Sequence, residues 1–373
     1  MSLKKFRISL TILGLIIFTP KVILADKSLD FPFKKFLLSK QTISLTHLSS
    51  VEAKEIVTNG NIALINTGRN IWTIKANDNK LVQKNFSTLN NSSIWYGVTC
   101  AFHDGFFIAV GDYPEERRNK ENKSPSGGFL AGPTPKGFIF LSKTLTERYL
   151  SNFIITSQSD DSSKDNRKKI FSYHLNGCAQ HNNNIVIGSY GSLGIADFNN
   201  GTIELIDEDE EPMYNRLPLH VEKKAIWNGM DEGGGNGGAW LEMRPFSGKV
   251  KQYNLSSNEE FRYVTALIRH RKKLFIGTNN GLFSLEENSG HFWHFDFGKQ
   301  LTNMPVSKLL SHNGFLWVFI GGEWLQVDVV NKKAIWYVDS LLTRLVTGSP
   351  FSDGWLLSGP SGIWKYSNNR KSY

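Results

Sequence analysis

The sequence predicts an all-β fold, a seven-bladed β-propeller of four-stranded antiparallel blades. One short pattern of a polar turn followed by an apolar strand recurs seven times, with starts at residues 58, 103, 181, 220, 270, 312 and 352. The starts lie about 40 residues apart, except for one wider gap after residue 103, and this period is typical of propeller blades. The 33 glycines and 25 phenylalanines favour many turns and many strands.

The copy from Thr265 to Glu286 is the most regular. Its sequence, TALIRHRKKLFIGTNNGLFSLE, contains three short apolar runs separated by polar turns at 270–273 and 278–281. This pattern predicts three antiparallel strands joined by tight turns. Three strands cannot bury an apolar face alone, so the unit needs the other six copies beside it.

The two ends of the chain predict how the ring closes. The seventh copy ends after its third strand at Tyr366, and residues 36–46 (FLLSKQTISLT) read as a strand that belongs to no copy. We expect this N-terminal strand to complete the last blade and remove an exposed sheet edge. An independent N-terminal arm is the alternative.

The first 25 residues predict a secretory signal peptide, which leaves 26–373 as a single propeller domain. Lys4, Lys5 and Arg7 precede an apolar run over residues 8–18, and Ala25 offers a cleavage site. The run is shorter than the roughly 18 to 20 residues of a membrane helix, and no later segment could span a bilayer. We therefore expect a periplasmic or secreted protein with no membrane span.

The charge argues against a nucleic-acid partner. The formal net charge of +9 falls to +5 without the leader, which contains four basic residues and no acidic one. This modest excess over almost 350 residues gives no basis for nucleic-acid binding.

After the polar turn, an apolar stretch leads into the motif G-T-x-x-G-L. This pattern is clearest at 274–282 and is echoed at 185–194 and 316–322. In this pattern the chain resembles the two-component regulator propeller repeats of bacterial periplasmic sensor regions. The resemblance covers nearly the whole mature chain and implies a sensor-like propeller. Unlike in that family, we expect no membrane helix, kinase or DNA-binding region after the propeller.

Long polar loops are expected on one face of the propeller, which we call the long-loop face. In a propeller, the connections from second to third strand open on the same face as those between blades. Four polar segments fall in such connections: 112–136, 160–169, 207–211 and the glycine-rich 231–238. Binding residues often lie on loops held by a rigid scaffold, although insertions without a role are also common there.

The residues that follow each second strand should lie nearest the channel on this face. The candidate ligand-binding residues at these positions are Arg69, Asp112, Tyr190, Asp231, Asn279 and Glu323. Trp95 and Tyr96 lie outside the register of the other repeated aromatics and are candidates for stacking on a ligand. Carboxylates and amides are oxygen ligands that suit Ca²⁺, so a calcium ion is possible here and no other cofactor is expected.

Cys100 and Cys178 occupy equivalent positions on the predicted inner strands of two neighbouring blades. In an oxidising compartment they are candidates for a disulfide, and two buried thiols are the alternative. Five of the nine histidines occupy one turn position in different blades, which favours a structural role over a shared metal.

These observations predict a ligand- or protein-binding module that acts through its long-loop face. Two alternatives stay open: an extracytoplasmic hydrolase or lyase that uses Asp112, Asp231 or Glu323, and a structural subunit of an envelope assembly. The sequence has no haem-attachment, nucleophile-elbow, zinc-protease or phosphate-loop motif, which favours binding over catalysis.

Overall fold

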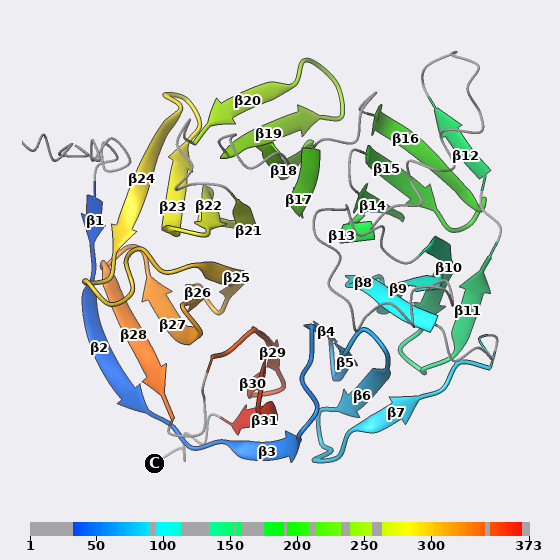
Figure 1. Cartoon of the computed structure of the whole chain (residues 1–373), viewed down its shortest axis with the longest axis horizontal. Coiled ribbons are helices and arrows are strands. Elements are labelled where there is room, and N and C mark those ends of the chain that lie inside the picture. Colours follow the sequence, from blue (N-terminus) through cyan, green and yellow to red (C-terminus); the bar gives the residue numbers. More distant parts are fainter. Residues whose placement is uncertain are drawn as a thin grey trace, which may run out of the picture.

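A computed structural model describes residues 33–87, 89, 94–112, 134–151, 154–157, 175–189, 192–208, 214–232, 239–255, 263–339 and 344–367. In this part of the chain the strands form seven sheets that stand around a central axis (Figure 1). The prediction of an all-β, seven-bladed propeller is therefore confirmed. The predicted signal peptide lies outside the described residues.

Each blade consists of four antiparallel strands, ordered from the channel outward. Blades 1 and 2 contain β4 (Glu55–Asn59), β5 (Ile62–Asn66), β6 (Ile71–Lys75) and β7 (Val82–Lys84), then β8 (Ile94–Phe102), β9 (Gly105–Asp112), β10 (Thr134–Leu141) and β11 (Glu147–Leu150). Blades 3 and 4 contain β13 (Leu175–His181), β14 (Asn184–Ser189), β15 (Ser192–Asp197) and β16 (Thr202–Glu208), then β17 (Tyr214–Val221), β18 (Ala225–Glu232), β19 (Ala239–Pro245) and β20 (Lys251–Asn254).

The remaining blades are built in the same way. Blades 5 and 6 contain β21 (Val264–His270), β22 (Lys273–Thr278), β23 (Gly281–Glu286) and β24 (His291–Asp296), then β25 (Val306–His312), β26 (Phe315–Ile320), β27 (Glu323–Asp328) and β28 (Lys333–Val338). Blade 7 contains β29 (Thr347–Phe351), β30 (Gly354–Gly359), β31 (Gly362–Ser367) and β3 (Thr46–Ser49). An extra strand, β12 (Ile154–Ser157), runs parallel to the outer edge of blade 3.

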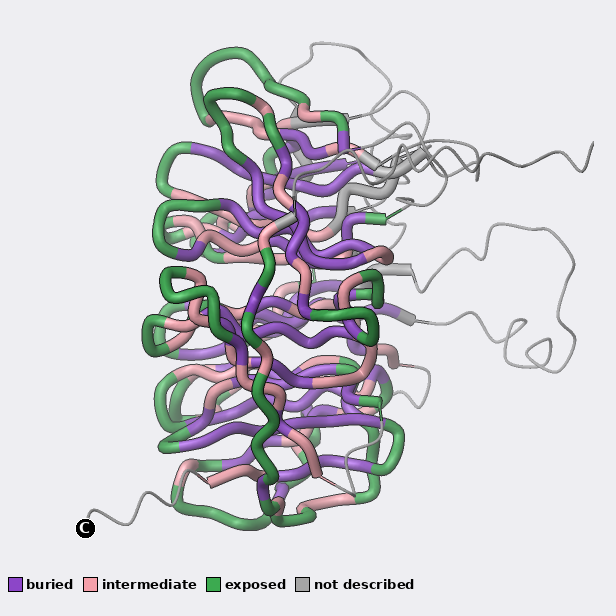
Figure 2. The backbone as a smooth tube through the Cα atoms, turned by 90° about the vertical axis from the view of Figure 1, so that its left-hand side faces the viewer, coloured by how far each residue is buried: buried purple, intermediate pink, exposed green. Residues whose placement is uncertain are grey.

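Apolar side chains fill the spaces between neighbouring blades. The second strands β5 and β30 are buried along their whole length because each lies between two other strands and under two neighbouring blades. Phe275 of blade 5 and Val318 of blade 6 belong to one such cluster, together with Phe295. Figure 2 shows the disc from the side of β1 and β2, with buried stretches inside and exposed turns along one face. Each blade thus buries both of its faces, which a single repeat cannot do alone.

The N-terminal segment closes the ring, as predicted, but through a different stretch of residues. The closing strand is β3, which pairs antiparallel with β31. The predicted bounds of 36–46 were wrong, because β2 (Leu37–Thr42) pairs parallel to β28 of blade 6, and β1 (Phe33–Lys35) pairs parallel to β24 of blade 5. The outer strands of blades 5 and 6 offered open edges, and an extended chain satisfies its backbone groups there before it reaches blade 7.

The inner strands of blades 2 to 6 share an irregularity near their first residues. In each of them the pairing with the second strand shifts register, for example between Val264 and Ala266 and between Val306 and Lys308. Such bulges bend a strand and re-aim the side chains beside them. Because inner strands begin at the connections between blades, these bulges lie on the long-loop side of the channel.

Three of the five histidines of the repeated turn, His181, His270 and His312, contact the next blade through their rings. His181 stacks on Phe246 with ring centroids 4.1 Å apart, and His270 Nδ1 lies 2.8 Å from Ser311 Oγ. His312 meets Trp355 edge-on at 5.9 Å. These contacts give the three histidines a packing role between blades. Among the described residues, no helix has the length and apolar character needed to cross a membrane.

Candidate functional site

A polar cluster links the inner strands of four blades near the long-loop end of the channel. Its central side chain is Lys308, which stands directly after the bulge of β25, where blade 3 has Gly177 and blade 5 has Ala266. Lys308 Nζ donates hydrogen bonds to Thr347 Oγ1 of blade 7 at 3.0 Å and to the carbonyl oxygen of Ile56 of blade 1 at 3.1 Å. One lysine therefore ties blade 6 to the two blades at the ring's closure.

Glu55 is the acidic partner of this cluster. It begins β4, next to Ile56, and its Oε2 accepts two hydrogen bonds from Thr99 of blade 2. The backbone nitrogen of Thr99 lies 2.9 Å from this oxygen and its hydroxyl lies 2.5 Å from it. The cluster consequently runs through blades 6, 7, 1 and 2.

The ring environment shifts both charged groups toward their neutral forms. Burial lowers the pKa of Lys308 and raises the pKa of Glu55, and the opposite charge of each residue counteracts the shift of the other. Two hydrogen bonds from Thr99 also oppose the rise in the pKa of Glu55. Both side chains keep some exposed surface although the inner strands enclose them, as expected for groups at a narrow channel.

The predicted stacking residues Trp95 and Tyr96 lie at the start of β8 but have different surroundings. Trp95 is half-buried; the Nζ atom of Lys54 lies 3.6 Å from the centroid of its ring, and the ring lies against Gly68. Tyr96 is 9% exposed and packs against Phe86 with ring centroids 5.6 Å apart. Burial and the charge of Glu147 raise the pKa of Tyr96 to about 12. Trp95 therefore keeps accessible surface, whereas Tyr96 belongs mainly to the core.

The other described candidates are spread around the ring rather than gathered at one point. Arg69 is exposed on the turn after β5. Asn279 exchanges hydrogen bonds with the backbone of Tyr263, which fixes the entry into β21. Glu323 Oε2 accepts a hydrogen bond of 2.8 Å from Trp336 Nε1 on the outer strand β28. The structure thus gives Asn279 and Glu323 structural contacts within their own blades.

Three predicted residues fall outside what can be described. Asp112 and Asp231 lie near the ends of β9 and β18, but their side chains lie outside the described part of the chain. Tyr190 lies outside it entirely, as does most of the four long loops. In the part that the structure describes, no three His, Cys, Asp or Glu side chains are arranged to hold a metal ion. The calcium site remains a prediction.

Cys100 and Cys178 lie on the inner strands β8 and β13 of adjacent blades. The structure joins them as a disulfide, with Cα atoms 6.0 Å apart, within the range that such a bond requires. Phe107 and Ile187, which pair with these cysteines on the second strands, belong to the same buried cluster. The bond therefore links blades 2 and 3 close to the channel.

The sequence analysis missed Lys308 and Glu55. A signal was present for Lys308, because a lysine stands where the inner strands of blades 3 and 5 have glycine and alanine and no other bulged inner strand has a charged residue at that position. The positions of the bulges must be known before this lysine can be aligned with its equivalents, because each bulge shifts the alignment of an inner strand by one residue or more. Glu55 carried no signal, since its strand has no bulge and begins at that residue.

Comparisons with known proteins establish the fold and no closer relationship. No protein-family model matches the chain, and no curated protein matches it either. Among solved structures, virginiamycin B lyase from Staphylococcus aureus is similar at a TM-score of 0.58 and 12% identity, over 87% of this chain and 98% of that one. The extracellular domain of a putative hybrid two-component system from B. thetaiotaomicron is similar at a TM-score of 0.57 and 12% identity. That match covers 88% of this chain and 40% of the other.

A third similar structure is YCF48 bound to a D1 peptide, with a TM-score of 0.56 and 10% identity over 91% of this chain and 98% of that one. The predicted resemblance to propellers of two-component systems is confirmed at the level of the fold. Propellers of this shape have varied roles, so the fold alone does not assign one to this chain.

Proposed function

We propose that this protein is an exported recognition module that binds a small polar ligand or a peptide at the long-loop end of its channel. The observation that carries the proposal is the presence of two opposite charges, Lys308 and Glu55, each held by hydrogen bonds to neighbouring inner strands and coupled to the other through space rather than by a direct contact. Enclosing a charge in protein costs free energy unless its hydrogen bonds are satisfied. Apolar residues would stabilise the propeller without that cost, so the two charges favour a functional role.

Each member of the pair keeps capacity for a further contact. Lys308 uses two of its three N–H groups, and Glu55 uses one carboxylate oxygen, in the hydrogen bonds made with described residues. A ligand with an acceptor for Lys308 and a donor for Glu55 would complete both sets. Amino acids, short peptides and their derivatives have this combination.

Export is supported by three independent features. The leader has the charged, apolar and cleavage regions of a signal peptide. The Cys100–Cys178 bond is typical of an oxidising compartment. The extracellular domain with the same fold is a precedent for propellers at that location. We place the mature protein in the periplasm or outside the cell on this basis.

The peptide-bound YCF48 structure supports recognition as a role for this fold, by analogy only. One observation favours the enzymatic alternative, a hydrolase or lyase. The pKa values of Lys308 and Glu55 are displaced toward each other, and perturbed pairs of this kind are enriched at catalytic sites. We prefer binding because the hydrogen bonds that hold both charged groups in place would also position them to contact a ligand.

The binding proposal is tested with Lys308→Met. Purified protein is heated in the presence of a panel of free amino acids, dipeptides and dicarboxylic acids, and the Tm is recorded. We expect at least one compound to raise the Tm of the natural protein, because a ligand that binds only the folded state stabilises it. The same compound should not raise the Tm of Lys308→Met.

Lys333→Met is the matched control, because Lys333 is an exposed lysine on the outer strand β28. It should respond to the compound as the natural protein does. A compound that raises the Tm of Lys308→Met and of the natural protein equally would refute the channel site. The export proposal is tested separately, by expressing the chain with its leader and sequencing the N-terminus; a mature protein that begins at Met1 contradicts it.

A further inference from the structure

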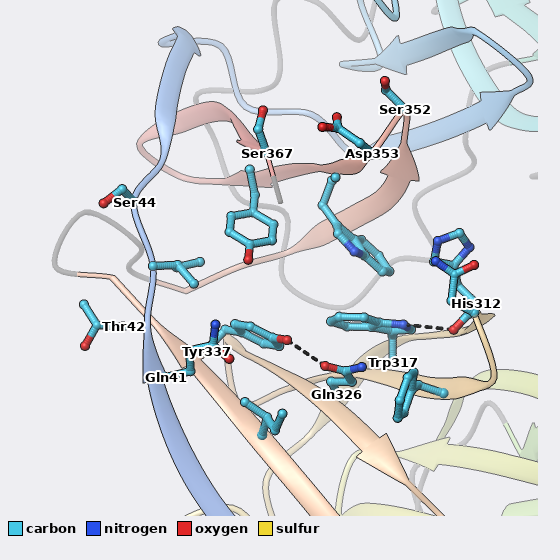
Figure 3. Close-up of a pocket in the computed structure, with 17 residues that line it drawn as sticks. Gln41, Thr42, Ser44, His312, Trp317, Gln326, Tyr337, Ser352, Asp353 and Ser367 are labelled. Carbon is cyan, nitrogen blue, oxygen red and sulfur yellow. Dashed lines mark hydrogen bonds between the residues drawn. The ribbon is translucent and has the colours of Figure 1, made fainter. Parts of the chain in front are cut away.

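A cavity of about 800 Å³ opens between blades 6 and 7 (Figure 3). It is lined by the turns between first and second strands of both blades, at His312–Asn313 and Ser352–Gly354. These turns lie at the opposite end of the inner strands from the bulges, so the cavity opens on the face opposite the long loops. It is separate from the Lys308 cluster, and its volume lies within the range of roughly 300 to 1,000 Å³ of ligand pockets.

Aromatic side chains form the floor and one wall of the cavity. Trp317 and Tyr337 are stacked, with ring centroids 5.7 Å apart and an angle of 21° between the planes. Trp355 leans on Trp317 at 4.5 Å, and Tyr366 lies beyond Tyr337 at 6.2 Å. Figure 3 shows Trp317 and Tyr337 side by side below the open space. Trp317, Tyr337 and Trp355 are buried and support one another, so the floor is rigid and preformed. The half-buried rings of Phe315 and Tyr366 offer the more accessible aromatic surface.

The polar groups of the cavity are almost all neutral. Tyr337 donates a hydrogen bond of 2.6 Å to Gln326 Oε1, and this contact orients the Gln326 side chain. Its amide nitrogen has no hydrogen-bond partner among the described residues and is free to donate. Among the described residues that line the cavity there is no lysine or arginine; the side chains that can carry charge near neutral pH are Asp353 and His312, and burial lowers the pKa of His312. The lining therefore suits an uncharged ligand.

The N-terminal segment supplies the outer wall. Residues 41–44 cross from β28 of blade 6 toward blade 7. The Gln41 side chain lies on the cavity side of this segment, whereas the side chains of Thr42 and Ser44 point away from the aromatic rings (Figure 3). The segment is fixed by a hydrogen bond of 3.1 Å from the Ile43 nitrogen to the Val338 carbonyl, and Ile43 is buried in the aromatic cluster. The strand that closes the ring thus also encloses the cavity.

We propose that this cavity binds a neutral oligosaccharide of two or three sugar units. One face of a pyranose ring presents C–H groups that stack on the negative faces of aromatic rings. Its edge presents hydroxyls that exchange hydrogen bonds with amides and hydroxyls, and such groups alternate with aromatics along the walls. Phosphate, sulfate or carboxylate groups would meet no lysine or arginine among the described lining residues and would face Asp353. This inference does not depend on the channel site.

The proposal is tested on an array of neutral and acidic glycans, followed by calorimetric titration of the folded protein with the best neutral trisaccharide. We expect binding to neutral glycans and a change in tryptophan fluorescence. Gln326→Ala should weaken affinity by about tenfold, the effect of one lost hydrogen bond. Gln41→Ala, at an exposed position on the cavity side of the N-terminal segment, should weaken it as well.

Gln252→Ala, an exposed glutamine on β20 of blade 4, is the matched control and should leave affinity unchanged. Three results would overturn the proposal. They are no neutral glycan bound on the array, a preference for acidic glycans or for aromatic peptides, and binding that neither Gln326→Ala nor Gln41→Ala weakens. Loss of the affinity in Lys308→Met would show that the sugar binds in the channel, which also contradicts the proposal.

Discussion

The channel cluster and the cavity between blades 6 and 7 use the same blade in opposite ways. Blade 6 contributes Lys308 from its inner strand to the first region and Trp317 from its second strand to the second. The channel cluster is charged and held in place by hydrogen bonds across several blades. The cavity is aromatic and nearly uncharged, and it is confined to one junction between blades.

The difference shows at which positions of a repeat a residue can be changed with little loss of folding stability. Inner strands face the narrow channel, so a large polar side chain can extend along it when a bulge re-aims the chain. Second strands are buried on both sides, so a change there must keep the volume of the core. A propeller can therefore place charge near its axis and aromatic surface between its blades, and the two regions should respond separately to substitution.

The largest effect is expected from removing the disulfide, which lies in neither region. Replacing Cys100 and Cys178 by serine should lower the free energy of unfolding by about 4 kcal/mol, because the bond closes a long loop in the unfolded chain. The sequence separation is 78 residues. Chemical denaturation measures the loss. Binding in the cavity should stay unchanged, since blades 2 and 3 contribute nothing to its lining; a parallel loss of binding would show that the two parts of the ring are coupled.

Trp317→Ala should lower the free energy of unfolding by about 3 kcal/mol, because Trp317 is 6% exposed and its removal leaves a void under Trp324 and Trp355. Urea denaturation followed by circular dichroism gives the value. Trp293→Ala is the control, since Trp293 is only half-buried at the outer edge of blade 5. Equal losses of stability for the two variants would contradict the claim that Trp317 contributes more to the core than a half-buried tryptophan does.

Lys308→Met should lower the free energy of unfolding by about 2 kcal/mol, below the full cost of breaking a buried pair because both groups keep some access to the channel. The double variant with Glu55→Gln should recover part of the loss, as expected for coupled residues. A double variant that loses the sum of the two single effects would show that the charges do not interact.

The pH dependence gives a sharper test of the same pair. The pKa of Glu55 is raised in the folded state, so stability should fall as pH rises from the ordinary glutamate value through the folded value. The pKa of Lys308 is lowered, so stability should rise again as pH increases toward the ordinary lysine value. In Lys308→Met the alkaline rise should shrink to the part contributed by Lys34 and Lys54, whose pKa values are also lowered by burial, and the fall on the acid side should grow, measured as Tm against pH. An unchanged alkaline limb would exclude Lys308 as its source.

The fold was predictable because every copy of the repeat has an apolar face that it must bury against a neighbouring copy. Each copy has a buried second strand bounded by polar turns, so seven copies predict seven blades without knowledge of any contact. The existence of a closing strand was predictable because the seventh copy supplies only three strands, but the bounds of that strand were not. Residues 37–42 have no property that distinguishes the outer edge of blade 6 from that of blade 7, and only the three-dimensional spacing of those edges decides.

The sites were less predictable because they depend on contacts between distant residues. Lys308 and Ile56 are 252 positions apart, and Thr99 meets Glu55 across a junction between two blades. The cavity depends on Gln41 and Gln326 lying on one pocket, which no pattern within a single repeat reveals. The equivalence of Cys100 and Cys178 was visible because both fall at the same repeat position. Sequence reasoning works on such shared positions and fails on contacts that only one junction makes.

The smallest effect is expected from Tyr337→Phe, which removes one hydroxyl and keeps the ring in its stack. The free energy of unfolding should fall by about 1 kcal/mol, because Gln326 loses the donor that holds its carbonyl oxygen. Affinity for a neutral trisaccharide should fall with it, since a free Gln326 side chain must be ordered when the ligand binds. The Tm shift caused by a channel ligand should stay as in the natural protein, because Tyr337 lies on the outer strand of blade 6, far along the sheet from Lys308 on the inner strand. Thermal scans with each ligand in turn measure both responses. If Tyr337→Phe changed the response to the channel ligand, the two regions of blade 6 would form one coupled unit, and the separation between axis and junction would have to be abandoned.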